Sequence, residues 1–214
     1  MLEVRGLNAG YGRAQVLFDV DLDVGQGEVV ALLGRNGAGK STTLKAIMGL
    51  VPRLSGEIVF DARPIRNLEP YEIARLGLGY VPEDRRIFTD LTVIENLEVA
   101  RQPPRGAAPP WTEERLFALF PALARLRDRR GARMSGGEQQ MLCIARTLAG
   151  NPSAILLDEP SEGLAPLVVA QVAQAIREIK RAGVTVLLAE QSRHFTDRVA
   201  DRAYFLEKGV IGSR

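Results

Sequence analysis

A chain of 214 residues is long enough for one compact α/β domain with an ample core. Its formal net charge is only +2 and its basic residues are scattered, which argues against nucleic acid as the main ligand. The single cysteine, Cys143, rules out an intrachain disulfide. The sequence shows neither a signal-peptide pattern nor an apolar run near the roughly 18 residues of a membrane span, so we expect a soluble cytoplasmic chain.

The N-terminal residues predict an antiparallel β portion. Residues 2–7 alternate between apolar and polar types, as an edge strand does, and residues 16–24 alternate again. Between them, residues 9–12 predict a turn with Tyr11 at its tip. An aromatic ring flanked by glycines has room to lie against a flat base, so Tyr11 is a candidate adenine platform. An ordinary exposed turn tyrosine is the alternative.

Residues 34–41, Gly-Arg-Asn-Gly-Ala-Gly-Lys-Ser, match the phosphate-loop template at each fixed position. An apolar run at residues 29–33 predicts a buried strand before the loop, and residues 41–50 predict a helix after it, so a chance match to a Gly-rich turn is disfavoured. Lys40 would reach the β- and γ-phosphates, and the Ser41 hydroxyl would bind Mg²⁺. The predicted nucleotide contacts are Gly34, Arg35, Asn36, Gly37, Ala38, Gly39, Lys40, Ser41 and Thr42.

After this helix the pattern predicts a strand over residues 55–61, a short helix over 70–76 and a strand over 79–81 that ends in a charged loop. Thr92 and Glu95 have the spacing of a capping box, so we expect Thr92 to begin another helix.

The next segment, residues 102–110, is rich in proline and predicts a linker within the helical middle of the chain. Apolar residues from 111 to 126 recur mainly at helical spacing, which predicts that they pack in the core. The arginines nearby could bind phosphate or RNA, but no aromatic residues interleave with them, so we interpret them as a solvated surface near a subunit contact. They are Arg125, Arg127, Arg129, Arg130 and Arg133.

A second phosphate site is predicted at residues 134–140, Met-Ser-Gly-Gly-Glu-Gln-Gln, where a long helix begins and runs to about Ala149. The free N–H groups and positive dipole of a helix N-terminus favour an anion. One domain has no evident use for two such sites, so we hypothesise that this one serves a nucleotide held by a partner subunit. An ordinary capped helix is the alternative. The candidate contacts are Ser135, Gly136, Gly137 and Glu138.

Two carboxylates end the apolar strand predicted at residues 154–159, and they lie 118 residues beyond Lys40. At the carboxyl edge of a parallel sheet, Asp158 can hold Mg²⁺ directly or through water. Glu159 is suited to accept a proton from, or to orient, the water that attacks the γ-phosphorus. Further on, residues 184–189 and 203–207 predict strands that complete the sheet, with a helix around 195–200 between them.

Taken together, these motifs resemble the nucleotide-binding subunit of an ABC transporter over essentially all 214 residues. Residues 80–88, 135–141, 161–166 and 189–191 are most similar to the second ATPase subunit of branched-chain amino acid importers. Urea and short-amide importers are close alternatives. The resemblance implies an α/β P-loop fold, with a mainly parallel sheet flanked by helices, an antiparallel β subdomain and a helical signature subdomain.

The same resemblance implies a single ABC ATPase domain over residues 1–214, with a nucleotide-binding core at about 1–82 and 151–214 and a helical subdomain at about 83–150. It implies a Mg-dependent ATPase that binds ATP and Mg²⁺. The implied partners are integral-membrane permease subunits, a second copy or a paralogous ATPase in a head-to-tail dimer, and a solute-binding protein of the same system. The subunit would lie at the inner face of the cell membrane.

Three positions depart from the family pattern, and one of them is Ala165, where the usual aspartate of the inter-subunit loop is absent. Glu83 stands where the family usually has a glutamine that reaches the metal, and its carboxylate can still bind Mg²⁺. Gln191 stands where many members have a histidine, and its amide can donate a hydrogen bond to phosphate but carries no titratable proton. Catalysis should therefore depend on Glu159, with Lys40 and Gln191 as helpers. His194 is three residues too late to replace the histidine, and we expect it on the surface.

The resemblance also implies that ATP binding closes two subunits and that hydrolysis reopens them. Closure would be passed to the permease through a groove near residues 83–86 and the helix at 92–99. A non-transport ABC ATPase acting on ribosomes or DNA is one rival, but the chain has one phosphate loop and no coiled-coil heptads. A metabolic kinase is another, in which residues 135–139 would have no purpose.

Overall fold

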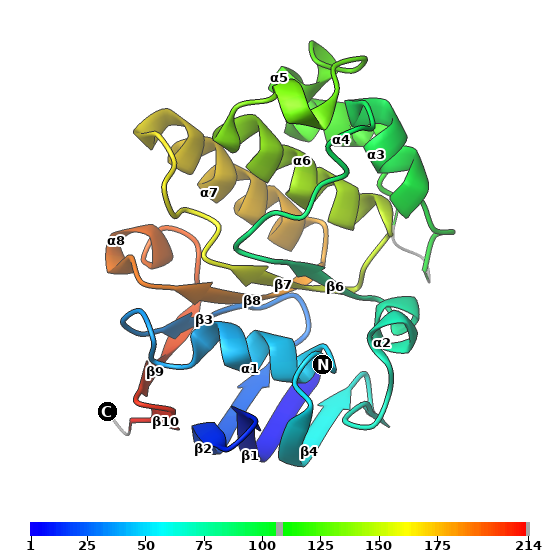
Figure 1. Cartoon of the computed structure of the whole chain (residues 1–214). Coiled ribbons are helices and arrows are strands. Elements are labelled where there is room, and N and C mark those ends of the chain that lie inside the picture. Colours follow the sequence, from blue (N-terminus) through cyan, green and yellow to red (C-terminus); the bar gives the residue numbers. More distant parts are fainter. Residues whose placement is uncertain (106–108, 213–214) are drawn as a thin grey trace.

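The computed structural model describes residues 1–105 and 109–212, and Figure 1 shows these residues as two sheets with helices between them and above them. The smaller sheet is antiparallel, with strand order β2-β1-β4-β5, and the larger has strand order β10-β9-β3-β8-β7-β6. The smaller sheet contains β1 (Leu2–Tyr11), β2 (Ala14–Val24), β4 (Arg53–Phe60) and β5 (Arg63–Pro64). The larger contains β3 (Val29–Leu33), β6 (Leu78–Val81), β7 (Ala154–Asp158), β8 (Thr185–Glu190), β9 (Arg202–Glu207) and β10 (Val210–Ile211).

The edge position predicted for residues 2–7 is wrong, because β1 pairs with β2 on one side and with β4 on the other. One buried face gives the same alternation in an interior antiparallel strand as in an edge strand, so the pattern does not report neighbours. Residues 9–11, predicted as part of a turn, continue β1 instead. The reversal is confined to residues 12 and 13, where Gly12 adopts φ +56°.

The larger sheet is parallel from β6 to β9, and β10 alone runs antiparallel to its neighbour. Every residue of β3, β7 and β8 is buried, which explains their continuous apolar runs. The carboxyl ends of these three strands lie together at one edge of the sheet. The strands predicted near residues 29, 79, 154, 184 and 203 are all confirmed.

Eight α-helices are found in the part of the chain that the structure describes. They are α1 (Lys40–Ile47), α2 (Pro70–Leu76), α3 (Val93–Ala100), α4 (Glu113–Leu119), α5 (Pro121–Ala124), α6 (Gly136–Ala149), α7 (Pro166–Arg181) and α8 (Arg193–Thr196), and a short 3₁₀ turn covers Gly131–Arg133. The predicted capping box is confirmed: the Thr92 hydroxyl accepts from the Glu95 N–H, and Glu95 Oε2 accepts from the Thr92 N–H at 2.7 Å.

The apolar residues between 111 and 126 pack in the core as predicted, and the chain forms α4 and α5 there with a break at Phe120. Pro121 has no N–H to donate and restricts the residue before it, so α4 ends there and α5 begins with the proline. Of the predicted linker, residues 102–105 and 109–110 form neither helix nor strand, and residues 106–108 lie outside the described part.

Two apolar cores lie on the two faces of the larger sheet. One core fills the space between the sheets around α1, and the other lies under α3, α6 and α7 (Figure 1). Alternate residues of β7 serve alternate cores, with Leu156 in the first and Leu157 in the second. The predicted helical middle therefore packs on one face of the sheet, and Cys143 is buried there as expected. Within the described residues, no helix combines the length and apolarity needed to cross a membrane.

Candidate active site

The predicted phosphate loop and carboxylates meet at the carboxyl edge of the larger sheet. A cavity of about 470 Å³ opens there, and we refer to it as the phosphate-loop cavity. It is lined by Val16, Asn36, Gly37, Gly39, Lys40, Ser41, Thr42, Glu83, Glu159 and Glu162. These residues come from the segments after β3, β6 and β7 and from β2, so the parallel arrangement of the strands assembles the site.

The phosphate loop is held close to the C-terminal strands. A Cβ on Gly34 would lie 2.5 Å from the Leu206 carbonyl oxygen, so a larger residue does not fit. The Gly209 N–H donates to the Ala38 carbonyl at 2.9 Å, which ties the β9–β10 turn to the loop. Gly39 is the N-cap of α1 at φ +112° and offers no capping side chain, so the first N–H groups of α1 are available to an anion.

Lys40 forms a buried ion pair with the predicted catalytic base. Its ammonium lies 2.8 Å from Glu159 Oε1, and the two side chains are only 4% and 7% exposed. The same ammonium donates to the carbonyls of Gly34 and Arg35, so its three donors are all used within the site. Burial raises the pKa of Glu159, although its contact with Lys40 opposes this rise. Glu159 also has a positive φ of +48°, a conformation that costs a non-glycine residue energy.

Asp158 is almost completely buried at this edge, at 1% exposure. Its Oδ1 accepts a hydrogen bond from the Ser41 hydroxyl at 2.8 Å, and its Oδ2 accepts one from the Tyr80 hydroxyl at 3.1 Å. Burial raises the pKa of Asp158, and the two hydrogen bonds act in the opposite direction.

The oxygen donors of Ser41 and Asp158 fit Mg²⁺, which is usually held by one or two carboxylates together with substrate phosphates and water. Glu83 lines the same cavity from the loop after β6. The described residues contain no group of three or more His, Cys, Asp or Glu that could hold a metal ion.

Gln191 and Glu159 meet through the Gln191 backbone. The Gln191 N–H is shared by Glu159 Oε2 and Glu190 Oε2, each at 3.2 Å. Glu190 is 1% exposed and also accepts from the N–H groups of Ser161 and Ser192, so it joins the end of β8 to the loop after Glu159. The sequence analysis gave Glu190 no role. The sequence feature that could have identified Glu190 is a carboxylate at the end of a mainly apolar strand, next to Gln191.

Tyr11 and His194 do not line the phosphate-loop cavity. Tyr11 ends β1 with 42% of its surface exposed, and Val16, not Tyr11, lines the phosphate-loop cavity. Its adenine contact stays a prediction. His194 is exposed at the start of α8, as expected. Glu162 lines the cavity but was not predicted.

The predicted second phosphate site lies at the start of α6. Ser135 caps this helix: its hydroxyl donates to Glu138 Oε2 at 2.9 Å, and its N–H donates to the same oxygen at 2.7 Å. A Cβ on Gly136 would lie 2.7 Å from Arg85 Nη1, and one on Gly137 would lie 3.0 Å from the Val168 methyl groups. None of Ser135–Glu138 lines the phosphate-loop cavity, so the two predicted phosphate sites are separate within one described chain.

A phosphate loop between a parallel strand and a helix, with two acids at the end of the next strand but one in the same sheet, defines a P-loop nucleotide-binding protein. Over residues 17–162 the chain matches the family described as ABC transporter. It therefore belongs to the ABC transporter family, as an ATP-hydrolysing, ATP-binding cassette.

Two curated relatives cover nearly the whole chain. The high-affinity branched-chain amino acid transport ATP-binding protein BraG of Pseudomonas aeruginosa is 42% identical over 211 residues, which are 99% of this chain and 91% of that protein. The lipopolysaccharide export system ATP-binding protein LptB of Escherichia coli is 38% identical over 212 residues, 98% of this chain and 88% of that protein. The predicted family is confirmed, and its similar members include proteins named for branched-chain amino acid transport and for lipopolysaccharide export.

A solved dimeric bacterial ABC transporter cassette is also similar. It superposes with a TM-score of 0.83 at 25% identity, covering 100% of this chain and 97% of that one. The predicted fold class is thereby confirmed, and cassettes of this fold form dimers.

Proposed function

We propose that this chain hydrolyses ATP in a site shared between two subunits and drives an importer for branched-chain amino acids. The buried ion pair of Lys40 and Glu159 is the observation that supports the ATPase part of this proposal. A bound triphosphate would attract the Lys40 ammonium, which frees the Glu159 carboxylate to accept a proton from the attacking water. Because burial raises the pKa of Glu159, this pKa lies closer to the operating pH than that of an ordinary glutamate does. Gln191 would donate its side-chain amide to phosphate.

Ser41 and Asp158 would hold Mg²⁺, and Glu83, which lines the same cavity as Ser41, would assist them. When bound, the ion neutralises charge that develops on the phosphate oxygens. The backbone N–H groups of Gly34–Thr42 would surround the phosphates, and Tyr11 would lie against the adenine.

The other half of the site would come from Ser135–Glu138 of a second subunit. Two observations support this arrangement: these residues do not reach the cavity of their own chain, and a similar cassette is a dimer. The free end of α6 offers N–H groups and a positive dipole to a phosphate held by the opposite phosphate loop. The second subunit would be another copy of this chain or a paralogous ATPase.

Mixing two inactive variants tests the shared site. Lys40→Ala removes the phosphate-loop cation, and Ser135→Arg places a bulky cation at the start of α6. Each variant alone should lose ATP turnover. Their mixture should recover part of it, because a hybrid dimer contains one intact pairing of loop and helix end. A mixture no more active than either variant, although its subunits exchange, would rule out the shared site.

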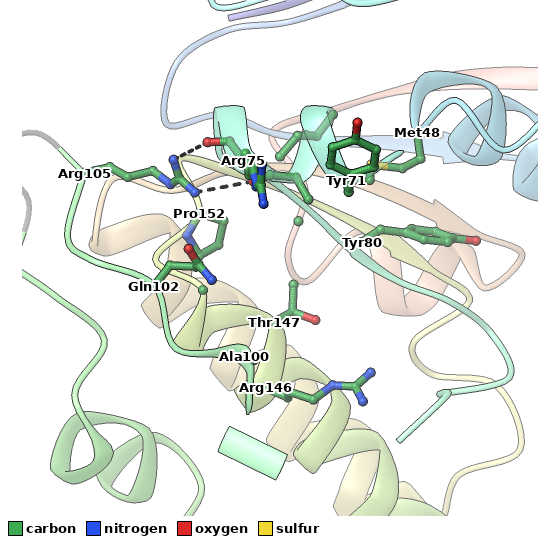
Figure 2. A pocket seen from close by; sticks show the side chains of 14 residues that line it. Met48, Tyr71, Arg75, Tyr80, Ala100, Gln102, Arg105, Arg146, Thr147 and Pro152 are labelled. Carbon is green, nitrogen blue, oxygen red and sulfur yellow. Dashed lines mark hydrogen bonds between the residues drawn. The ribbon is translucent and has the colours of Figure 1, made fainter. Parts of the chain in front are cut away.

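A groove beside β6 supports an integral-membrane partner. It has a volume of about 430 Å³ and lies between α2, the end of α3 and α6 (Figure 2). Tyr71, at 60% exposure, and Tyr80 supply aromatic surface, while Arg75, Arg105 and Arg146 supply positive charge. A permease loop that carries apolar and acidic side chains would be complementary. Docking there would place the chain at the inner face of the membrane.

The transported substrate rests on the 42% identity to BraG. A second candidate, a subunit of a lipopolysaccharide exporter, is favoured by the 38% identity to LptB. Urea and short-amide importers are further alternatives. Purification of the native complex from membranes, followed by reconstitution in vesicles with its solute-binding protein, distinguishes them. ATP-dependent uptake of leucine or isoleucine supports the importer, whereas a complex that lacks a solute-binding protein and extracts lipopolysaccharide supports the exporter.

A further inference from the structure

Tyr80 joins two features that the proposed function treats separately. Its ring lines the groove beside β6, and Figure 2 shows the hydroxyl directed away from Arg105 and Gln102 at the far side of the groove. That hydroxyl donates to Asp158 Oδ2 at 3.1 Å, at the metal end of the phosphate-loop cavity. One side chain therefore forms part of the groove wall and contacts the acid proposed to hold Mg²⁺.

Strand register explains how the contact arises. Tyr80 of β6 is paired with Leu156 of β7, and Asp158 lies two residues further along the same strand. Residues two apart point to the same face of a sheet, so Tyr80, Leu156 and Asp158 share the face that α1 covers. Ser41, at the start of α1, and Tyr80, on the neighbouring strand β6, both donate hydrogen bonds to Asp158.

The two carboxylate oxygens of Asp158 have different partners. Ser41 donates to Oδ1, but a Ser41 oxygen that binds a metal ion would direct its proton elsewhere. The Tyr80 hydroxyl occupies Oδ2 and leaves Oδ1 to face Ser41, which itself lines the phosphate-loop cavity.

We propose that Tyr80 is a positioning residue for the metal end of the ATPase site, because its hydroxyl fixes the Asp158 carboxylate with Oδ1 turned toward Ser41. This inference rests on the proposal that Asp158 and Ser41 hold Mg²⁺. A group that hydrogen-bonds a metal ligand typically changes metal affinity 10- to 100-fold when it is removed. The effect of Tyr80 should therefore appear in the Mg²⁺ dependence of nucleotide binding and not in metal-free binding.

The test is Tyr80→Phe, which keeps the ring in the groove wall and removes the hydroxyl. Binding of a fluorescent ATP analogue is titrated with Mg²⁺ and also measured in EDTA. The Mg²⁺ concentration for half-maximal enhancement should rise about tenfold, at the low end of the range above. Affinity in EDTA should stay within about twofold of wild type. ATP turnover should show a raised KM for Mg²⁺ and a kcat that recovers at high Mg²⁺.

Tyr71→Phe is the matched control, because it removes a hydroxyl from an exposed tyrosine of the same groove. It should keep the wild-type Mg²⁺ dependence. Thermal unfolding of both variants verifies that they are folded at the assay temperature. An unchanged Mg²⁺ half-saturation in Tyr80→Phe overturns the role of Tyr80.

Asp158→Asn separates this failure from failure of the proposed metal site. If Asp158→Asn loses the Mg²⁺ enhancement while Tyr80→Phe keeps it, the metal site stands and the positioning role is wrong. If Asp158→Asn itself keeps the wild-type enhancement, Asp158 does not hold the ion, and the role of Tyr80 falls with it.

Discussion

The Lys40 ammonium and the Glu159 carboxylate form an ion pair of 2.8 Å, with both side chains more than nine-tenths buried. The cation of the phosphate loop and the proposed base therefore neutralise each other in the structure. Removing one member of such a pair leaves an uncompensated charge in a buried place.

This pairing makes Lys40 a determinant of stability as well as of binding. Lys40→Met should lower the free energy of unfolding by about 3–5 kcal/mol, because the buried Glu159 carboxylate is left without its cation. Chemical denaturation measures the change. The double variant with Glu159→Gln should recover a large part of it, since neither charge is then present. If the double variant is no more stable than Lys40→Met, then Lys40 and Glu159 are not energetically coupled.

Glu159→Gln alone should lower ATP turnover by about 10²–10⁴-fold, the contribution usual for a positioned base. Nucleotide binding should persist, because Lys40 and the loop amides remain. The control is Glu162→Gln, which changes another carboxylate of the same cavity and should keep turnover within a few-fold of wild type. Full turnover in Glu159→Gln would exclude Glu159 as the base.

Gly34 is expected to tolerate no side chain. A Cβ there would lie 2.5 Å from the Leu206 carbonyl oxygen, and its φ is outside the left-handed region, so the cost is steric. Gly34→Ala should destabilise the protein by about 1–3 kcal/mol, as overpacking does, and should weaken ATP binding. For comparison, Gly212→Ala would place its Cβ 4.0 Å from the nearest backbone oxygen and should change stability by less than about 0.5 kcal/mol. Equal unfolding temperatures of the two variants would contradict this explanation.

Glu190 predicts a pH dependence of stability. Burial raises its pKa above the ordinary value of 4.5, so the folded protein binds this proton more tightly than the unfolded chain does. The associated stability is present below pH 4.5 and is lost as pH rises through the folded-state pKa. Glu190→Gln has no such proton and serves as the reference. Relative to this variant, wild type should lose stability as pH rises from 4.5 through the folded-state pKa of Glu190, and the difference in stability should stay constant at higher pH. Unfolding of both proteins from about pH 4 to 8 measures the difference. A difference that is flat or that changes in the opposite direction would refute the expectation.

Local sequence rules predicted the parts of the fold that are locally determined. The phosphate loop, the capped starts of α3 and α6 and the buried parallel strands all follow from residues within one turn or one strand. The break between α4 and α5 has a local cause as well, because Pro121 has no N–H to donate.

Other features depend on residues that the chain brings together from a distance. The interior position of β1 depends on β4, about fifty residues later, and no property of residues 2–7 encodes it. The contacts of Tyr80 with Asp158 and of Glu190 with Ser161 cross between segments in the same way. At the candidate site, residue types could be predicted from sequence, but hydrogen-bond partners could not, because strand order and register decide them.

The hydrogen bond from Gly209 to Ala38 has a consequence for biosynthesis. The phosphate loop leaves the ribosome early, but the turn that braces it is made about 170 residues later. At translation rates of about 5–20 residues per second, the loop waits on the order of ten seconds or more for this support. A growing chain therefore carries the nucleotide motif well before it has the rigid loop that the motif needs.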